Sequence, residues 1–491
     1  MANKNEKTAA ERYSKMKSQN VLIAALFSIC VLSTPLHATT SEPGYSHTGP
    51  TLISNVRLLD GLGNPPVEGR DILLKGGKIA AIGVTGSLPA TEGVLVIDGE
   101  DMTAMPGLMD LHIHTQGGWA NGVIPGERYA PSYEDKDVQQ RLNGYVYAGV
   151  TTVLDVGADH EWVVQTRDRI NNGDLFGPRH FTTGVAWSSA PSGWDSGNTS
   201  GDDWAASTKV ENLADLPGQV ARYKEDGIEI LKAYAGIGTV GLQALVAEAE
   251  KQGLRVIADL WMLNFNKQVA QTTGLHGWAH TGGFEVAPMK YHEWMAENDR
   301  FVIPTINVGE MLSAGRVLDE DGSSAMLKEP LIVDIWGKET VEDFYRVYPQ
   351  IRDHYYDGRL AFYQLNNFGN MARFRPNMQE NTRLSIEAGV LVGCGTDDVY
   401  PSAWPGESTH REMKLMVMGG VEPLKAIKAC TSDSAKILNR EDEFGSLSVG
   451  LSADILLVAG NPAENIDDTR NVREVFLRGK QVDRGSLKFS D

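Results

Sequence analysis

The sequence predicts an α/β fold: a (β/α)₈ TIM barrel that carries a small β-sandwich domain composed from both chain ends. Two observations predict it. Short β-rich runs alternate with helical patterns through the middle of the 491-residue chain. Further β-rich runs with glycine turns stand on either side of that region, as in Thr51–Leu59 and Val472–Val482. We therefore expect the small domain at 50–105 and 440–485, and the barrel at 106–439.

Eight runs are candidate barrel strands: 107–113, 150–156, 180–186, 228–234, 254–260, 276–280, 301–306 and 390–396. Helical patterns lie between them, as in Asp137–Ala148, Gly238–Gln252 and Gln379–Ala388. The interval 308–379 is longer than one crossover requires. Its aromatic and charged residues in helical spacing predict an insertion over the barrel mouth.

Residues 1–38 are typical of a secretory signal peptide. Basic residues precede an apolar run, Val21–Ser33, and the small-residue site Leu36–Ala38 follows it. The run is short for a bilayer span, so we expect cleavage, no stable membrane span afterwards, and a periplasmic or secreted protein. A short membrane anchor is the alternative.

Composition argues against nucleic acid as a partner and predicts no disulfide bond. The net charge of −19 argues against nucleic-acid binding through a basic surface. Without the signal peptide only Cys394 and Cys430 remain, both in apolar surroundings, so no disulfide framework is expected.

Metal-ligand residue types stand at the ends of four predicted strands. His112 and His114 alternate at the end of the first strand, so both rings face one side. Lys232 lies inside the apolar fourth strand, His280 ends the sixth, and Asp397 ends the eighth. The carboxyl ends of barrel strands meet at one mouth, where these side chains would form a site for one or two Zn²⁺-like ions.

These residues resemble the amidohydrolase superfamily of metal-dependent hydrolases, over roughly residues 50–485. The motifs that carry the resemblance are Pro106–His114, Gly149–Asp155, Gly395–Asp397, His410–Met413 and Gly450–Leu457. The chain looks most similar to the imidazolonepropionase-like and Xaa-Pro dipeptidase-like branch.

The resemblance implies roles for these residues. His112, His114 and Asp397 would hold one Zn²⁺, His280 would help to hold a second, and an N6-carboxylated Lys232 would bridge them. Mn²⁺ is also an acceptable ion. Asp397 would be the catalytic acid and base that takes a proton from the attacking water and passes it to the leaving amine.

Other residues would surround these ligands. His410 would orient a ligand from behind, and Tyr234, two residues after Lys232, would contact substrate. A packed barrel tyrosine is an equal alternative for Tyr234. Trp187 and Trp261 lie near strand ends and would form aromatic walls of the substrate pocket, although ordinary packing of the loop after Trp187 is nearly as compatible with the pattern.

Strand five departs from the family pattern. The family has histidine there, whereas this chain has Asp259, and Trp261 occupies the second histidine position. Asp259 could itself bind the second ion, because carboxylate oxygen is an acceptable Zn²⁺ or Mn²⁺ ligand. Alternatively the site is mononuclear, with Lys232 an ordinary partner of Asp259, or the site has decayed.

The expected function is hydrolysis of an amide or peptide-like C–N bond by a metal-bound hydroxide. Candidate substrates are small molecules: an N-acyl amino acid, a dipeptide or a cyclic amide. The alternatives are a deaminase, a hydrolase of lactones or carbamate esters, and a catalytically silent barrel that binds a ligand. The resemblance also implies a homo-oligomer.

Overall fold

The computed structural model of the chain describes these residues: 42–116, 134–188, 208–209, 212–234, 237–259, 271–312, 328–344, 346, 373–398 and 403–489. The predicted signal peptide, Trp261 and parts of the predicted insertion lie outside them. Within these ranges, no helix has the length and apolar character needed to cross a membrane.

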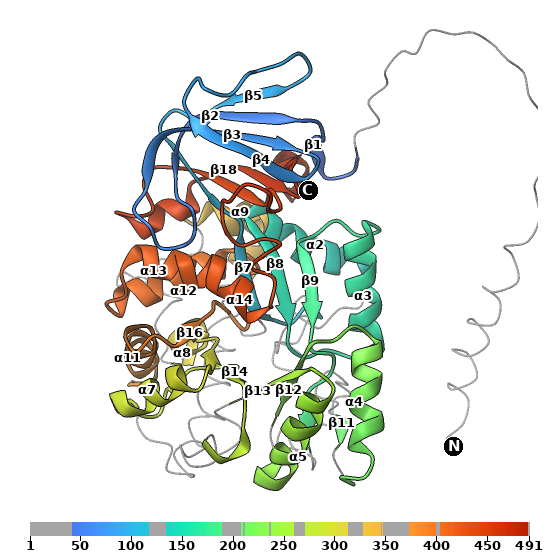
Figure 1. Cartoon of the computed structure of the whole chain (residues 1–491). Coiled ribbons are helices and arrows are strands. Elements are labelled where there is room, and N and C mark those ends of the chain that lie inside the picture. Colours follow the sequence, from blue (N-terminus) through green and yellow to red (C-terminus); the bar gives the residue numbers. More distant parts are fainter. Residues whose placement is uncertain are drawn as a thin grey trace, which may run out of the picture. The chain divides into compact units, whose positions relative to one another are not determined.

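A nine-stranded sheet takes its strands from both ends of the described chain (Figure 1). Its order is β1-β19-β18-β17-β6-β2-β3-β4, and β5 pairs with β2. The strands are β1 (Tyr45–His47), β2 (Thr51–Leu58), β3 (Val67–Lys75), β4 (Lys78–Val84), β5 (Leu95–Asp98), β6 (Met102–Pro106), β17 (Ile455–Ala459), β18 (Val472–Leu477) and β19 (Lys480–Val482).

Local chemistry explains two features of this sheet. Gly76 and Gly77 both have positive φ, 61° and 79°, and form the two-residue turn that joins β3 to β4. The antiparallel pairing of β17 with β6 joins the two chain ends, and a core that includes Ile53, Leu457 and Phe476 packs against it. β6 ends at Pro106, and β7 begins two residues later.

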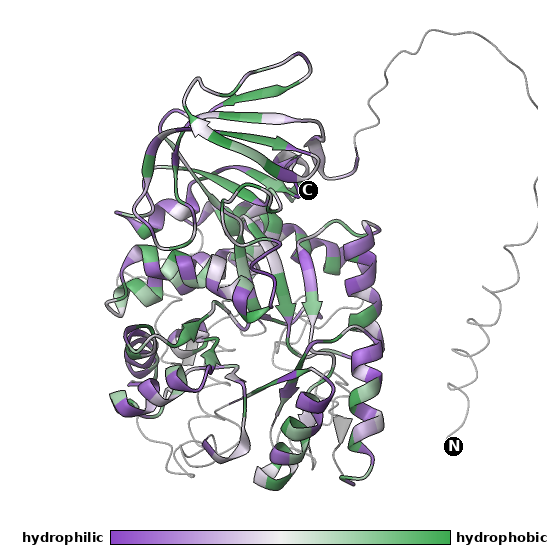
Figure 2. Ribbon diagram, viewed as in Figure 1, coloured by the Kyte–Doolittle hydropathy of each residue, from purple (hydrophilic) through white to green (hydrophobic). Residues whose placement is uncertain are grey.

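The α/β region contains two all-parallel sheets. One is ordered β7-β8-β9 and the other β11-β10-β12-β13-β14-β15-β16. Their strands are β7 (Leu108–Ile113), β8 (Val150–Asp155), β9 (Arg179–Thr182), β10 (Trp187–Ser188), β11 (Thr208–Lys209), β12 (Ile230–Ala233), β13 (Arg255–Ala258), β14 (Gly277–Trp278), β15 (Phe301–Val302) and β16 (Leu391–Val392). Figure 2 shows that β7 and β8 are mainly apolar, and every residue of both strands is buried.

The strand ladder differs from the predicted closed ring. Backbone hydrogen bonds join β7 to the segment after β16, from Leu111 N to Cys394 O at 2.7 Å and from Asp397 N to His112 O at 2.7 Å. Among the described strands, β9 and β10 follow one another along the third predicted strand but belong to different sheets, since β9 pairs with β8 and β10 pairs with β12. The chain leaves the extended conformation between them at Gly184, where φ is +66°. The structure therefore shows a mixed α/β fold without a complete barrel ladder.

Helices follow most of these strands. They are α2 (Asp135–Tyr147), α3 (His160–Asn172), α4 (Leu216–Glu225), α5 (Gly238–Lys251), α7 (Met289–Glu297), α8 (Ile306–Leu312), α9 (Pro330–Trp336), α11 (Phe374–Glu387), α12 (Glu407–Met418), α13 (Pro423–Lys428) and α14 (Ser434–Ile437). A π-helix, η4 (Ala429–Asp433), joins the last two, and two 3₁₀ helices, η5 (Ile466–Arg470) and η6 (Arg484–Leu487), lie near the C-terminus. The ends of α3 show local control: the Asp159 side chain accepts a hydrogen bond from Trp162 N, and Gly173 ends the helix at φ 85°.

Helix α9 is one described part of the predicted insertion. Helix α9 packs on the outside of α2, where Ile335 O accepts a hydrogen bond from Gln140 Nε2 and Asp334 accepts one from Tyr147. Tyr147 is the last residue of α2, close to the start of β8, so α9 lies near the end of the sheet opposite to the ligand-bearing ends. Apolar residues of α9 are buried there, which explains the placement.

The expectation of no disulfide is wrong. Cys394 and Cys430 are bonded, with their Cα atoms 4.7 Å apart. The apolar surroundings noted in the sequence are real, since both residues are completely buried, but they hold a cross-link between the segment after β16 and η4. Apolar flanks do not distinguish a buried thiol from a buried disulfide.

Candidate metal centre

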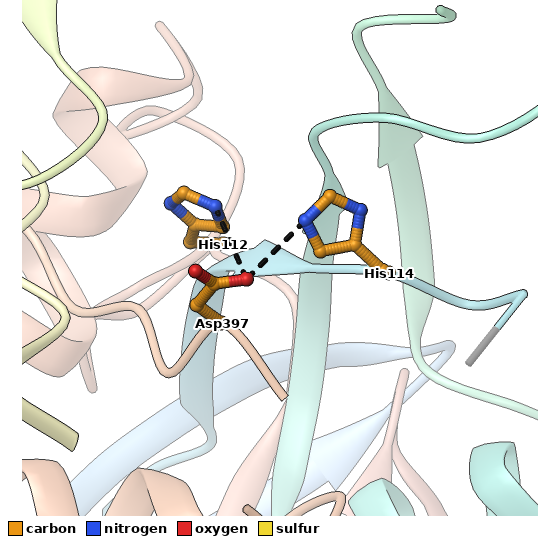
Figure 3. A group of neighbouring side chains, drawn as sticks. All are labelled: His112, His114 and Asp397. Atoms are coloured by element: carbon orange, nitrogen blue, oxygen red, sulfur yellow. Dashed lines mark ion pairs between the residues drawn. The ribbon is translucent and has the colours of Figure 1, made fainter. Parts of the chain in front are cut away.

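Two histidines project from the end of β7. His112 is fully buried and His114 is 7% exposed, with their ring centroids 5.6 Å apart. The run Leu108–Ile113 is an entirely buried strand: Met109, Leu111 and Ile113 alternate on one face, and the other face carries the polar residues that include His112. Figure 3 shows both rings directed toward Asp397.

Hydrogen bonds determine the tautomer of both rings. Nδ1 of His112 lies 2.8 Å from Ala279 O, and Nδ1 of His114 lies 2.6 Å from Gly157 O. A carbonyl oxygen only accepts hydrogen bonds, so each Nδ1 carries the proton. Each Nε2 then presents a lone pair to the site, which is the form of imidazole that binds a metal ion.

Asp397 brings a carboxylate between the two rings. It follows β16 in the left-handed region, at φ 53°, and its backbone N–H donates to His112 O. Its Oδ1 lies 3.3 Å from Nε2 of His114 and 3.7 Å from Nε2 of His112 (Figure 3). This Oδ1 is buried, with no donor placed in line with it. One ligand atom from each residue lies within 4.8 Å of the others, which suits a divalent cation.

A second group of side chains adjoins this cluster. Nζ of Lys232, in β12, lies 3.3 Å from Nε2 of His112. Oδ2 of Asp259, directly after β13, lies 3.3 Å from Nε2 of His280, and that same Nε2 lies 4.0 Å from Oδ2 of Asp397. All are buried. The structure therefore brings together all six predicted ligand residues.

Burial shifts the charge states in the direction that a metal site requires. Desolvation, helped by the nearby positive charge of Lys232, holds the pKa of His112 well below its ordinary value, so that its ring stays neutral. Burial also lowers the pKa of Lys232, partly offset by the carboxylates of Asp259 and Asp397. For His114, burial opposes the charged form but the Asp397 carboxylate outweighs it, so the pKa is raised. A cation bound there would compete with that proton.

Comparison with known proteins identifies the family. Residues 103–482 match the Amidohydrolase family, which is more than half of the chain. The chain belongs to the amidohydrolase family.

Individual relatives resemble parts of this amidohydrolase. Enamidase from Eubacterium barkeri is 30% identical over 112 residues, covering 22% of this chain and 26% of the relative. Imidazolonepropionase from Streptococcus pyogenes is 33% identical over 113 residues, covering 21% of this chain and 26% of the relative. The chain thus spans about a quarter of the length of the curated relatives it matches.

A solved structure resembles almost the whole chain. The crystal structure of a Xaa-Pro dipeptidase with bound methionine covers 90% of this amidohydrolase and 100% of its own chain, with a TM-score of 0.66 and 24% sequence identity. At this identity the likeness shows a shared fold.

Two predicted site residues lie elsewhere. The Trp187 side chain is fully buried in the core, 4.8 Å from the ring of Tyr223 on α4. Trp187 pairs in register with Ala233, one residue after Lys232, so it faces the helices while Lys232 faces the site. His410 on α12 bonds Thr469 Oγ1 and Ala148 O, so both of its ring nitrogens are used away from the ligands.

The other predicted contact residues are only partly described. Tyr234 is half-buried, and its ring centroid lies 5.6 Å from Nζ of Lys232, so it adjoins the ligand cluster. Trp261, which occupies the second histidine position of the family on strand five, lies outside the described residues.

Two buried carboxylates beside the ligands were missed in the sequence. Asp398 accepts hydrogen bonds from His114 N at 3.0 Å and from the Tyr145 hydroxyl. Asp110 accepts hydrogen bonds from Thr396 and Thr409. The sequence pattern that could have indicated them is an ionisable residue close to a ligand inside an apolar strand end. Asp110 lies two residues before His112, and Asp398 directly follows Asp397.

Proposed function

We propose that this chain is a metal-dependent hydrolase that cleaves an amide or peptide-like C–N bond, on a barrel of eight β/α units. One observation carries the proposal: two imidazoles, each bonded through Nδ1 to a carbonyl oxygen, direct Nε2 at the same buried carboxylate oxygen of Asp397. A buried carboxylate is costly unless a positive charge compensates it, and a divalent cation bound between the two rings would do so.

The residues present fit two ions. His112, His114 and Asp397 would hold the first, and Asp259 with His280 would hold the second, since their facing atoms are 3.3 Å apart. When bound, such ions supply Lewis acidity, which polarises a scissile carbonyl and lowers the pKa of an attacking water. Zn²⁺ suits this nitrogen and oxygen donor set, and Mn²⁺ is acceptable where carboxylates contribute more.

Lys232 would join the two halves as an N6-carboxylated side chain. An ammonium group 3.3 Å from a metal-ligating nitrogen would repel the cation. Burial lowers the pKa of Lys232 and so favours the neutral amine, whose lone pair can add to carbon dioxide with loss of a proton. The product is an anion with two oxygens, placed between His112 and the carboxylates.

Asp397 would move the proton during the reaction. Its carboxylate is buried at the centre of the ligand cluster, where it can accept a proton from the attacking water and return it to the leaving nitrogen. Asp398 and Asp110 would hold the two strand ends in register: Asp398 accepts from the backbone N–H of His114, and Asp110 accepts from those of His112 and Thr396.

The substrate would be a small amide: an N-acyl amino acid, a dipeptide or a cyclic amide. The family membership supports hydrolysis, and the names of the matched relatives and of the similar structure support C–N bonds. Tyr234, whose ring centroid lies 5.6 Å from Nζ of Lys232, would contact a substrate carboxylate.

Metal analysis and substrate assays of the purified mature chain test this function. We expect one or two ions of zinc or manganese per chain, turnover on a panel of N-acyl amino acids, dipeptides and cyclic amides, and loss of turnover in chelator that returning the ion restores. A protein that holds no ion, or that binds a panel member equally well in chelator without converting it, would instead be a ligand-binding barrel.

The same measurement on Asp259→Ala tests the second ion site. If Asp259 is a ligand, the substitution lowers the ion content by about one per chain while His112, His114 and Asp397 keep the other. Asp226→Ala is a matched control, because Asp226 pairs with His160 at a half-buried position away from the cluster. If Asp259→Ala keeps the same number of ions per chain, Asp259 is not a metal ligand and acts only as a partner of Lys232.

Export to the periplasm or the outside is the proposed location. The signal-peptide pattern of residues 1–38 supports it, and so does the Cys394–Cys430 bond, since such bonds persist in oxidising compartments. We expect protein recovered from the periplasm or medium to begin after the predicted cleavage site and to show essentially no reactive thiol after denaturation without reductant. Two reactive thiols in freshly isolated protein would contradict the proposal.

A further inference from the structure

His280 is held differently from the other two histidines of the site. His112 and His114 each bond a carbonyl oxygen through Nδ1, whereas Nδ1 of His280 lies 2.6 Å from the Thr305 hydroxyl. A hydroxyl can donate or accept, so it selects a tautomer only when its own proton is already committed. The Thr305 hydroxyl donates to Pro304 O at 2.7 Å. It therefore accepts from His280, whose proton is on Nδ1 and whose Nε2 lone pair faces Asp259.

Thr305 holds this position with an unusual backbone. Its φ is +55°, in the left-handed region that β-branched residues rarely adopt, and it is fully buried between β15 and α8. A conformation of this kind persists only where the surrounding structure enforces it. The residue after it, Ile306, begins α8, so whatever fixes the start of α8 also fixes Thr305.

A buried carboxylate fixes the start of α8. Oε1 of Glu412 accepts from Ile306 N at 2.7 Å, and Oε2 accepts from Asn307 N at 2.8 Å and from Asn307 Nδ2 at 2.9 Å. Glu412 is fully buried on α12. None of these three hydrogen bonds involves a predicted metal ligand. Its hydrogen bonds leave α8, and with it Thr305, little freedom to turn.

Helix α12 also contacts the end of β7. Thr409, three residues before Glu412 and therefore on the same helix face, donates to Asp110 at 3.0 Å. Asp110 in turn accepts from the backbone and side chain of Thr396, which precedes Asp397. One face of α12 thus supports both the segment that ends at Asp397 and the segment that carries Thr305.

We propose that Thr305 and Glu412 are positioning residues for the second ion of the hydrolase. Glu412 fixes the first residues of α8, this fixes Thr305, and the Thr305 hydroxyl keeps His280 in the tautomer that presents Nε2 beside Asp259. The inference rests on the proposed function, because it presumes that His280 binds an ion.

Thr305→Val and Thr305→Ser form the matched pair that tests the hydroxyl. Valine keeps the branched shape but cannot accept from Nδ1, whereas serine keeps the hydroxyl. We expect Thr305→Val to weaken binding of the second Zn²⁺ or Mn²⁺ by about 10- to 100-fold, the usual effect of losing a partner behind a ligand, and Thr305→Ser to restore it. Titration of ion-free protein with each metal alone measures this without any substrate.

A double-mutant cycle separates positioning from general support. If Thr305 acts only through His280, then Thr305→Val should add almost nothing to the loss caused by His280→Ala. The melting temperature of the ion-free protein, measured for both variants, is the structural readout that separates a loss of folding from a loss of ion affinity. If the losses of ion affinity in Thr305→Val and His280→Ala add up in the double variant, Thr305 does not act through His280.

Glu310→Gln is the matched control for Glu412→Gln. Glu310 is also a buried glutamate of the α8–α12 contact, but it pairs with Arg411 and Arg375 and does not touch the start of α8. We expect Glu412→Gln to weaken the second ion about 10-fold, and Glu310→Gln to lower the melting temperature while ion affinity stays the same. Equal effects of both variants on affinity would overturn the role of Glu412.

The outcomes distinguish this inference from the function on which it rests. A wild-type chain that binds no ion refutes the proposed hydrolase itself. A wild-type chain that binds two ions, together with a Thr305→Val variant that binds both with unchanged affinity, leaves the hydrolase intact and refutes the positioning role.

Discussion

Asp397→Asn is expected to lower kcat/KM by a factor on the order of 10³ and to remove most of the first ion. The carboxylate has two roles in the proposed site: it neutralises a cation beside His112 and His114, and it carries the proton from water to the leaving nitrogen. An amide oxygen has no net charge and cannot accept the proton, so both roles fail together. Because Asn tolerates the left-handed backbone found here, at φ 53°, the fold should survive.

Ion content, kcat and KM of Asp397→Asn should be measured at saturating metal as well as at limiting metal. If catalysis fails beyond loss of the ion, kcat stays low when the metal site is refilled. Asp454→Asn is a suitable control, because Asp454 is a buried carboxylate paired with Arg179 outside the ligand cluster. Near-normal kcat in metal-saturated Asp397→Asn would assign proton transfer to another group.

Lys232→Met is expected to decrease turnover by about two to three orders of magnitude while making the ion-free protein more stable. Burial outweighs the attraction of Asp259 and Asp397 and lowers the pKa of Lys232, so methionine, which has a similar volume, removes a charge that destabilises the ion-free fold. Methionine cannot form a carbamate, so the bridge between the two ion positions would be lost. Opposite signs in stability and activity distinguish a functional lysine from a structural one.

Thermal unfolding of ion-free wild type and Lys232→Met measures the first effect, and turnover with added metal measures the second. Mass analysis of the intact native wild-type chain at neutral pH should also show the mass of an added carboxylate, which disappears in Lys232→Met and after acidification. If Lys232→Met melts well below wild type when both are ion-free, Lys232 contributes to the fold through a partner such as Asp259.

Local patterns in the sequence were sufficient to predict the strands whose ends carry the ligands. The alternation of His112 and His114 follows from the strand period of two, and the apolar run before them predicts the buried strand that β7 forms. Strand β12 around Lys232 and the helices near Asp137–Ala148 and Gly238–Gln252 follow from equally local patterns, and the structure contains them as β12, α2 and α5.

The sequence did not predict the direction of side chains where a strand or helix meets a loop. The glycine- and serine-rich loop after Trp187 predicts a pocket wall, but the register of Trp187 with Ala233 directs its side chain to the core. The position of His410 after the eighth strand predicts a group that orients a ligand, yet its ring bonds Ala148 and Thr469. Both errors concern contacts between segments that are distant in sequence.

By itself, the sequence determined which residue types end which strands, and through them the family and the six residues that gather at one site. Only the tertiary structure decided which nitrogen of each histidine faces the site, that Cys394 bonds Cys430, and that Glu412 stands behind His280 through Thr305. The physical reason is the range of the interactions. Strand and helix periods act over a few residues, whereas a tautomer or a cross-link depends on an atom that the fold brings from tens or hundreds of positions away.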